Sequence, residues 1–136
     1  MWNYKKMKVW QRADVLSKEI HGLTLLFPKF EKWELGGQMR RSSASVPDNI
    51  SEGSKKTTEK SFIKFLDDAK GSLAELETQV GRAFEVGYFN EEVERKYLNE
   101  LNEIDKMLNG VKRYLKKKIW EAEEKRKKEK GLSGKG

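Results

Sequence analysis

Apolar residues recur along this chain at alternating steps of four and three, the spacing that keeps one side of an α-helix facing its partners. Three segments carry this pattern with large side chains: Val9, Ala13, Leu16, Ile20, Leu23 and Phe27; Phe62, Leu66, Ala69, Leu73, Leu76, Val80 and Ala83; and Tyr97, Leu101, Ile104, Leu108, Val111 and Leu115. Another segment keeps the spacing with smaller or polar residues, namely Leu35, Met39, Ser42, Val46, Asn49 and Gly53. Four stripes joined by short breaks predict an all-α fold, an antiparallel up-down four-helix bundle.

Breaks in the pattern set the limits of the predicted helices. Pro28 ends the first helix, because the residue before a proline is pushed out of the helical region. Thr57 or Thr58 caps the third helix, Gly87 supplies its left-handed C-cap, and Asn90 caps the fourth. We therefore expect one bundle domain over residues 1–118, with helices at about 8–27, 33–54, 58–87 and 90–118.

The positive charge of the chain is concentrated at its C-terminal end. The formal net charge is +7, and residues 112–130 hold ten Lys/Arg against four Asp/Glu, whereas residues 1–111 balance to zero. Glutamates placed four residues before lysines, as in Glu121 and Lys125, favour helix. We expect residues 119–136 to form a charged helical extension that frays near 125–130 into a disordered tail.

The segment Gln38–Gly53 is unusual because small and polar residues occupy its inward stripe. It is a close-packing seam, a buried polar site or a binding face. Pro47 lies inside it and removes a backbone hydrogen bond, which predicts a kink in this helix. The kink either bends the helix around the core or shapes an oligomer contact or groove.

Asn49 and Glu77 both fall on apolar stripes. A buried carboxylate without a partner is very costly, so Glu77 should be paired, with Arg40, Arg41 or Asn49 nearest by register. We expect a buried polar network of Asn49 and Glu77, with a functional pocket as the alternative.

Basic residues supply the candidates for nucleic-acid contact, because Lys and Arg bind phosphate. The candidates are Arg40, Arg41, Lys55, Lys56, Lys112, Arg113, Lys116, Lys117 and Lys118. Tyr114 and Trp120 are available for base stacking in the tail. The alternatives are salt bridges with the interleaved acidic residues of the second and third helices and, for the tail, a solvated helix end that aids solubility.

Several chemistries lack the residues that they need. The chain has no cysteine and one histidine, His21, which excludes thiolate zinc sites and multi-histidine metal centres. It contains no glycine-rich phosphate loop and no serine with an evident base. We therefore expect no catalytic residues, metal or cofactor. The start lacks an apolar signal core and no apolar run is long enough to span a bilayer, so we expect a cytoplasmic protein without a membrane partner.

Several runs taken together resemble a known family. KVWQRA, QMRRSSASVPDNISEG, FIKFLDDAKGSLAELETQV and KMLNGVKRYLK are similar to the four-helix bundle proteins encoded in 23S rRNA intervening sequences, also called S23 ribosomal proteins. The likeness covers roughly residues 4–116. The arginine pair matches as Arg40 and Arg41, and the chain keeps the family's runs Pro47–Gly53 and Ser72–Gln79.

The resemblance implies a non-enzymatic bundle that assembles as a homopentamer, associated with RNA or with a nucleic-acid-handling protein. It also implies a likeness in fold to the accessory variability protein of diversity-generating retroelements, a basic protein that works with a reverse transcriptase. The competing expectation is a protein–protein scaffold or accessory subunit that does not itself bind nucleic acid.

Overall fold

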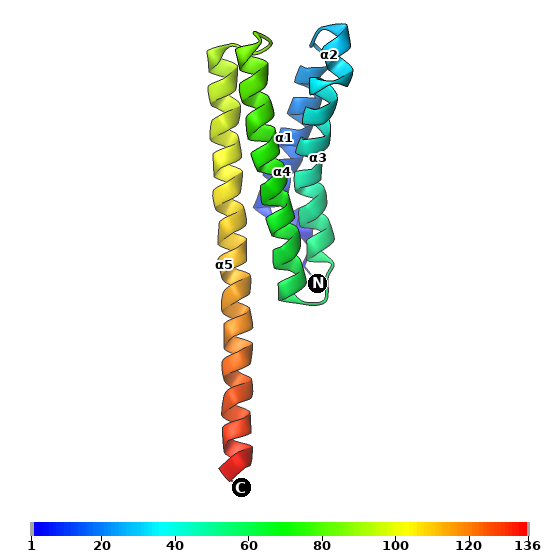
Figure 1. The fold of residues 1–136 in the computed structure, drawn as a ribbon. Coiled ribbons are helices and arrows are strands. Elements are labelled where there is room, and N and C mark those ends of the chain that lie inside the picture. The colour runs from blue at the N-terminus through cyan, green and yellow to red at the C-terminus, as the bar shows by residue number, and fades with distance from the viewer. Residues whose placement is uncertain (1, 136) are drawn as a thin grey trace.

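The computed structural model describes residues 2–135, and the side chains of residues 2–131, as an all-helical chain without strands (Figure 1). Four long helices dominate: α1 (Lys8–Thr24), α3 (Leu35–Ser54), α4 (Glu59–Glu85) and α5 (Glu91–Lys135). A short 3-10 helix, η1 (Tyr4–Lys6), precedes α1, and a single turn of helix, α2 (Lys29–Trp33), precedes α3. The predicted all-α class with four long helices is confirmed.

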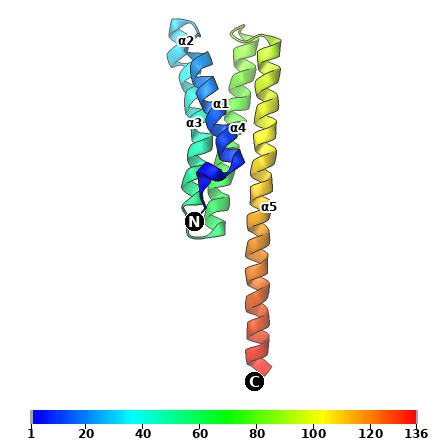
Figure 2. The same ribbon diagram turned by 180° about the vertical axis from the view of Figure 1, so that it is seen from behind.

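The long helices lie side by side, and the turns that join them alternate between the two ends of the molecule (Figures 1 and 2). Helix α3 packs against both α1 and α4, and α4 packs against α5, while α1 and α5 touch over a smaller area. The predicted apolar stripes face this common core. Its largest fully buried side chains are Leu16, Ile20, Met39, Val46, Ile50, Phe62, Leu66, Leu76, Val80, Ile104, Leu108 and Leu115.

Helix α3 packs closely against α4 where its inward residues are small. A Cβ atom added at Gly53 would lie 2.8 Å from Phe62 Cδ1 and 2.8 Å from Phe65 Cβ, closer than side chains approach one another. Ser42, Ser43 and Ser54 are buried in the same helix. The small-residue segment is therefore a close-packing seam. Pro47 lies inside α3 and is buried.

The predicted caps on α4 and α5 are present. Thr58 Oγ1 accepts a hydrogen bond from the Ser61 backbone N–H at 3.1 Å, and Asn90 Oδ1 accepts one from the Val93 N–H at 2.8 Å. Gly87 adopts a φ of 87°, the left-handed conformation that glycine tolerates at a helix C-terminus.

The corner between α1 and α3 differs from the prediction. Helix α1 ends at Thr24 rather than Phe27, since the chain leaves the helix through turns in which Leu26 and Phe27 donate to the Leu23 and Thr24 carbonyls. Residues 29–33 then form the separate helix α2, and α3 begins at Leu35. Helix α1 therefore ends about one turn before the position that Pro28 predicts.

Helix α5 also differs from the prediction, because it continues to Lys135 without the expected fraying near residues 125–130. Gly136 lies outside the described residues. Beyond the level of the α3–α4 turn, α5 projects alone from the bundle (Figure 1). At about 1.5 Å per residue, residues 119–135 extend roughly 25 Å.

We predict that Gly53→Ala destabilises the protein, because the new methyl group enters the occupied space against Phe62 and Phe65. Overpacking costs about 1–3 kcal/mol, of which alanine's better helix propensity offsets up to about 1 kcal/mol. Urea denaturation measures the difference in unfolding free energy.

Gly71→Ala is the matched control, since Gly71 lies in α4 with open space around its Cα. This substitution should stabilise the protein by up to about 1 kcal/mol. Equal stability of the two variants would contradict the close-packing account of α3 and α4.

Candidate nucleic-acid interface

The guanidinium group of Arg40 is bonded within the subunit. Its Nη1 donates to Thr24 Oγ1 at 3.0 Å, its Nη2 donates to the Lys32 carbonyl at 2.7 Å, and it lies 5.8 Å from the centre of the Trp33 ring. Gly36 leaves room for it, because a Cβ there would come within 3.2 Å of Arg40 Nη1. Arg40 therefore fastens α1, α2 and α3 together at their corner, and its donors point inward.

Arg41 differs from its neighbour, because its side chain is exposed on α3. Of the predicted arginine pair, only Arg41 presents its guanidinium outward. Spacing along the helix does not separate the two, since both lie off the centre of the α3 stripe.

The structure does not bring Glu77 and Asn49 together in a buried network. Glu77 is exposed, so the prediction of its burial is wrong. The buried arc of α4 centres near Leu76, and at about 100° per residue Glu77 falls beyond the edge of that arc. The prediction measured its angle from Leu66 and Leu73, which lie at the edge rather than the centre.

Asn49 instead belongs to a polar cluster across the α3–α4 seam. Its Nδ2 donates to Ser45 Oγ at 3.0 Å and to the Ser45 carbonyl at 2.8 Å, and Ser72 Oγ donates to Ser45 Oγ at 2.9 Å. Ser42 Oγ contributes a further bond to Glu75 Oε2 at 3.3 Å. Ser45 and Ser72 were missed, although the i,i+4 spacing of Ser45 and Asn49 was a visible signal.

Charged residues of α5 within the bundle are paired across helices. Lys112 Nζ bonds Asp67 Oδ1 of α4, and Lys70 of α4 bonds Asp105 at 2.6 Å. Lys112 is therefore committed to the bundle. The other predicted basic candidates that follow it on α5 are all exposed: Arg113, Lys116, Lys117 and Lys118.

The contact between α1 and α5 is also ionic. Arg12 donates from Nε and Nη2 to the two carboxylate oxygens of Glu100 at 2.8 and 2.9 Å, and this bonding raises the pKa of Arg12. Nearby, burial together with the adjacent Glu19 raises the pKa of Tyr97 to about 12. Some of the charges in the body of the bundle thus join one helix to another.

Lys55 and Lys56 lie at the end of the bundle where α5 leaves it. They form the turn between α3 and α4, both are exposed, and their Nζ atoms lie 5.6 Å from the Tyr4 ring and 5.0 Å from the Phe65 ring. Trp2 links this turn to α5. Its backbone N–H donates to the Ser54 carbonyl at 3.0 Å, and the centre of its ring lies 5.5 Å from the centre of the Tyr114 ring.

Six of the predicted basic candidates are therefore exposed at this end of the bundle, and we call this set the basal basic surface. It consists of Lys55, Lys56, Arg113, Lys116, Lys117 and Lys118. Arg40 and Arg41 lie away from it, about 21 Å further along α3 at 1.5 Å per residue. The candidates predicted from sequence thus fall into two separate groups.

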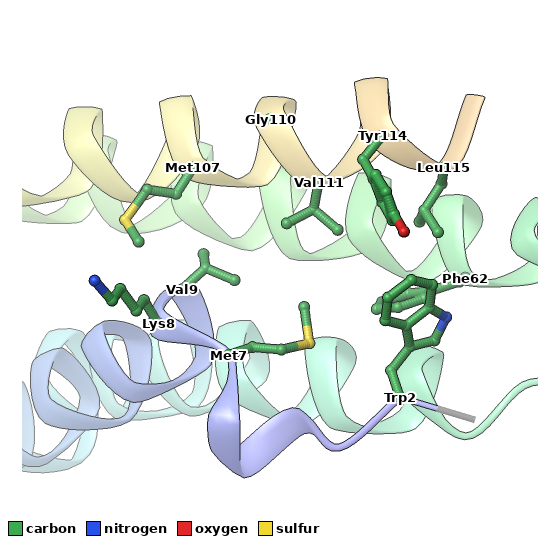
Figure 3. A pocket seen from close by; sticks show the side chains of 10 residues that line it. All are labelled: Trp2, Met7, Lys8, Val9, Phe62, Met107, Gly110, Val111, Tyr114 and Leu115. Atoms are coloured by element: carbon green, nitrogen blue, oxygen red, sulfur yellow. The ribbon is translucent and has the colours of Figure 1, made fainter. Parts of the chain in front are cut away.

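An open apolar pocket of about 450 Å³ lies between the N-terminal segment and α5 at the same end (Figure 3). Trp2 and Tyr114 stand at one end of it and Met107 and Lys8 at the other, with Gly110 and Val111 on the α5 wall between them. Its lining is almost wholly apolar, so the pocket supplies apolar contact area rather than reactive side chains.

Among residues 2–135, no cluster of three or more His, Asp or Glu side chains is arranged to hold a metal ion. Within the same range, no helix combines the length and the apolar character needed to cross a bilayer.

These observations define a helical-bundle protein with a charge-balanced body and a basic projecting helix. The profile of the 23S rRNA-intervening sequence protein family matches residues 5–110, and the chain belongs to that family. The match ends before the basic part of α5, so the basic extension lies outside the matched region.

A solved structure supports the fold. This chain is similar to the crystal structure of a protein with unknown function from the S23 ribosomal protein family of Bacteroides thetaiotaomicron VPI-5482. The TM-score is 0.71 and the sequence identity is 23%. The similarity covers 76% of this chain and 97% of that one. No curated relative matches the chain.

We predict that Arg40→Ala lowers the unfolding free energy by about 1.5–3 kcal/mol, because hydrogen bonds that involve a charged group contribute about this much. Arg41→Ala is the matched control and should change stability by no more than about 0.5 kcal/mol. Urea denaturation of both variants measures the contrast. Similar stabilities would contradict the structural role of Arg40.

Proposed function

We propose that this chain is a non-enzymatic, homo-oligomeric binding module of the cytoplasm that associates with RNA or other nucleic acid through the phosphate backbone. The observation that carries the proposal is the basal basic surface. Its exposed side chains stand at one end of a bundle whose residues 1–111 have no net charge. The name of the family, which refers to 23S rRNA, adds support.

The mechanism would be electrostatic. Lys and Arg side chains neutralise phosphates and release condensed counterions, so affinity depends on salt and tolerates differences in sequence. The projecting part of α5 extends the surface away from the bundle and adds Lys125, Arg126, Lys127, Lys128 and Lys130. Basic residues on both sides of the point where α5 leaves the bundle would thus contact one nucleic-acid strand together.

We also propose that the chain assembles as a homopentamer, which the family resemblance implies. The four long helices would run up and down in turn within each subunit, and a bend of α3 at Pro47 would fit its outer face to a neighbour. Exposed Leu26 and Phe30, at 82% and 69% exposure, supply apolar area for such contacts. A ring would multiply weak phosphate contacts by avidity.

The second candidate is a protein scaffold or accessory subunit, for example to a reverse transcriptase, without direct binding of nucleic acid. The same exposed apolar side chains and the apolar pocket beside Trp2 favour it. Such contacts would be nearly insensitive to salt, whereas phosphate contacts would not.

The test combines a mass measurement with RNA titrations at two salt concentrations. Light scattering should give about 80 kDa, five times the 15.9 kDa of one chain. Binding of a single-stranded RNA oligonucleotide should weaken by about 7- to 340-fold between 50 and 200 mM salt, for two to six phosphate contacts at a slope of about −0.7 each.

Each part of the proposal fails separately. A mass of one chain would contradict the oligomer. Absence of RNA binding at 50 mM salt would contradict the nucleic-acid role and favour the scaffold. If the protein binds RNA but its affinity does not change with salt, the phosphate mechanism is contradicted.

A further inference from the structure

The two aromatic residues of the basic part of α5 have different surroundings. Tyr114 packs edge-on against Trp2 at 5.5 Å, and Lys118 Nζ lies 5.4 Å from its ring. Trp120 is 61% exposed and, within the described part of the chain, takes part in none of the aromatic or cation–π contacts. Tyr114 therefore serves the fold, while the indole of Trp120 is available to a partner.

Helix geometry places three exposed cations beside Trp120. Arg113, Lys116 and Lys117 precede it by seven, four and three residues, so all lie within about 60° of its direction around the helix. We call Trp120 and these three residues the Trp120 face. The whole set spans about 10 Å along the axis.

Acidic residues do not neutralise this part of the face. Residues 113–120 contain no Asp or Glu. Glu123 and Glu124 follow Trp120 on the same side of the helix, but Glu124 Oε1 is engaged with Lys127 Nζ at 3.5 Å. The positive charge is therefore concentrated on the N-terminal side of the indole.

We propose that the Trp120 face binds single-stranded nucleic acid, with an unpaired base stacked on the Trp120 indole and neighbouring phosphates held by Arg113, Lys116 and Lys117. This inference rests on the proposed function and deepens it, because it names the class of nucleic acid. The faces of bases inside a duplex are covered by their neighbours, so an exposed indole stacks on unpaired bases.

The charges also argue against an apolar protein partner for Trp120. Seating the indole in an apolar pocket would draw its three neighbouring cations out of water, which is costly unless each one finds a counter-charge. A nucleic-acid strand meets both demands, because it supplies a stacking surface and phosphates together.

The test compares Trp120→Ala with Trp33→Ala in the full chain. Trp33 is 74% exposed and lies in α2, at the other end of the bundle, so it controls for loss of an exposed indole. The probes are a 12-nucleotide single-stranded oligouridylate and a 12-base-pair RNA duplex, titrated at the same salt concentration.

We expect Trp120→Ala to weaken binding of the single strand by about 5- to 150-fold, the usual effect of losing one stacked base, and to change duplex binding by less than about twofold. Trp33→Ala should leave both affinities unchanged. Trp120→Phe should retain most of the single-strand affinity, because it keeps an aromatic face. Quenching of tryptophan fluorescence by the single strand should persist in Trp33→Ala and be lost in Trp120→Ala.

Four results would overturn the inference. If the unchanged protein binds neither probe, the proposed function fails and the inference fails with it. If it binds RNA but Trp120→Ala has no effect, or weakens strand and duplex equally, only the inference fails. If Trp120→Ala reduces the mass in light scattering and leaves RNA affinity intact, Trp120 is a protein contact.

Discussion

The close approach of α3 and α4 is the constraint on which the rest of this bundle depends. Gly53 lets α3 lie against Phe62 and Phe65 of α4, and Ser45, Asn49 and Ser72 satisfy one another along the same seam. A large side chain at Gly53 would separate the helices and open the core that α1 and α5 complete. The unusual composition of α3 is thus a requirement of packing.

This packing also determines where charge remains available. Cross-helix pairs such as Lys70–Asp105, Lys112–Asp67 and Arg12–Glu100 use the charges of the body to join helices. Arg40 is likewise used at the α1–α3 corner. Helix α5 loses its neighbours where it passes the α3–α4 turn, so its basic residues beyond that point are exposed. Packing contacts and exposed basic residues therefore occupy different parts of one helix.

The sequence predicted the helices better than the polar contacts, for physical reasons. Periodicity and caps such as Thr58 and Asn90 are local, and they located the four long helices. Burial of Glu77 depended on which residue lies at the centre of the α4 arc, and separating Arg40 from Arg41 required the position of α2. Such contacts arise from tertiary geometry, which spacing along one helix does not contain. The charged extension of α5 was predicted from i,i+4 pairs, but its continuation to Lys135 was not, because exposed charged helices carry no apolar signal.

The central claim is that the basal basic surface, rather than total charge, binds nucleic acid, and matched charge removal tests it most directly. One variant changes Arg113, Lys116, Lys117 and Lys118 to Gln; the other changes four exposed basic residues at the opposite end, Lys29, Arg82, Arg95 and Lys96, to Gln. Both lose four positive charges. The account predicts that single-stranded RNA affinity falls by about 100-fold or more in the first variant and by less than about threefold in the second. Equal losses in the two variants would contradict it.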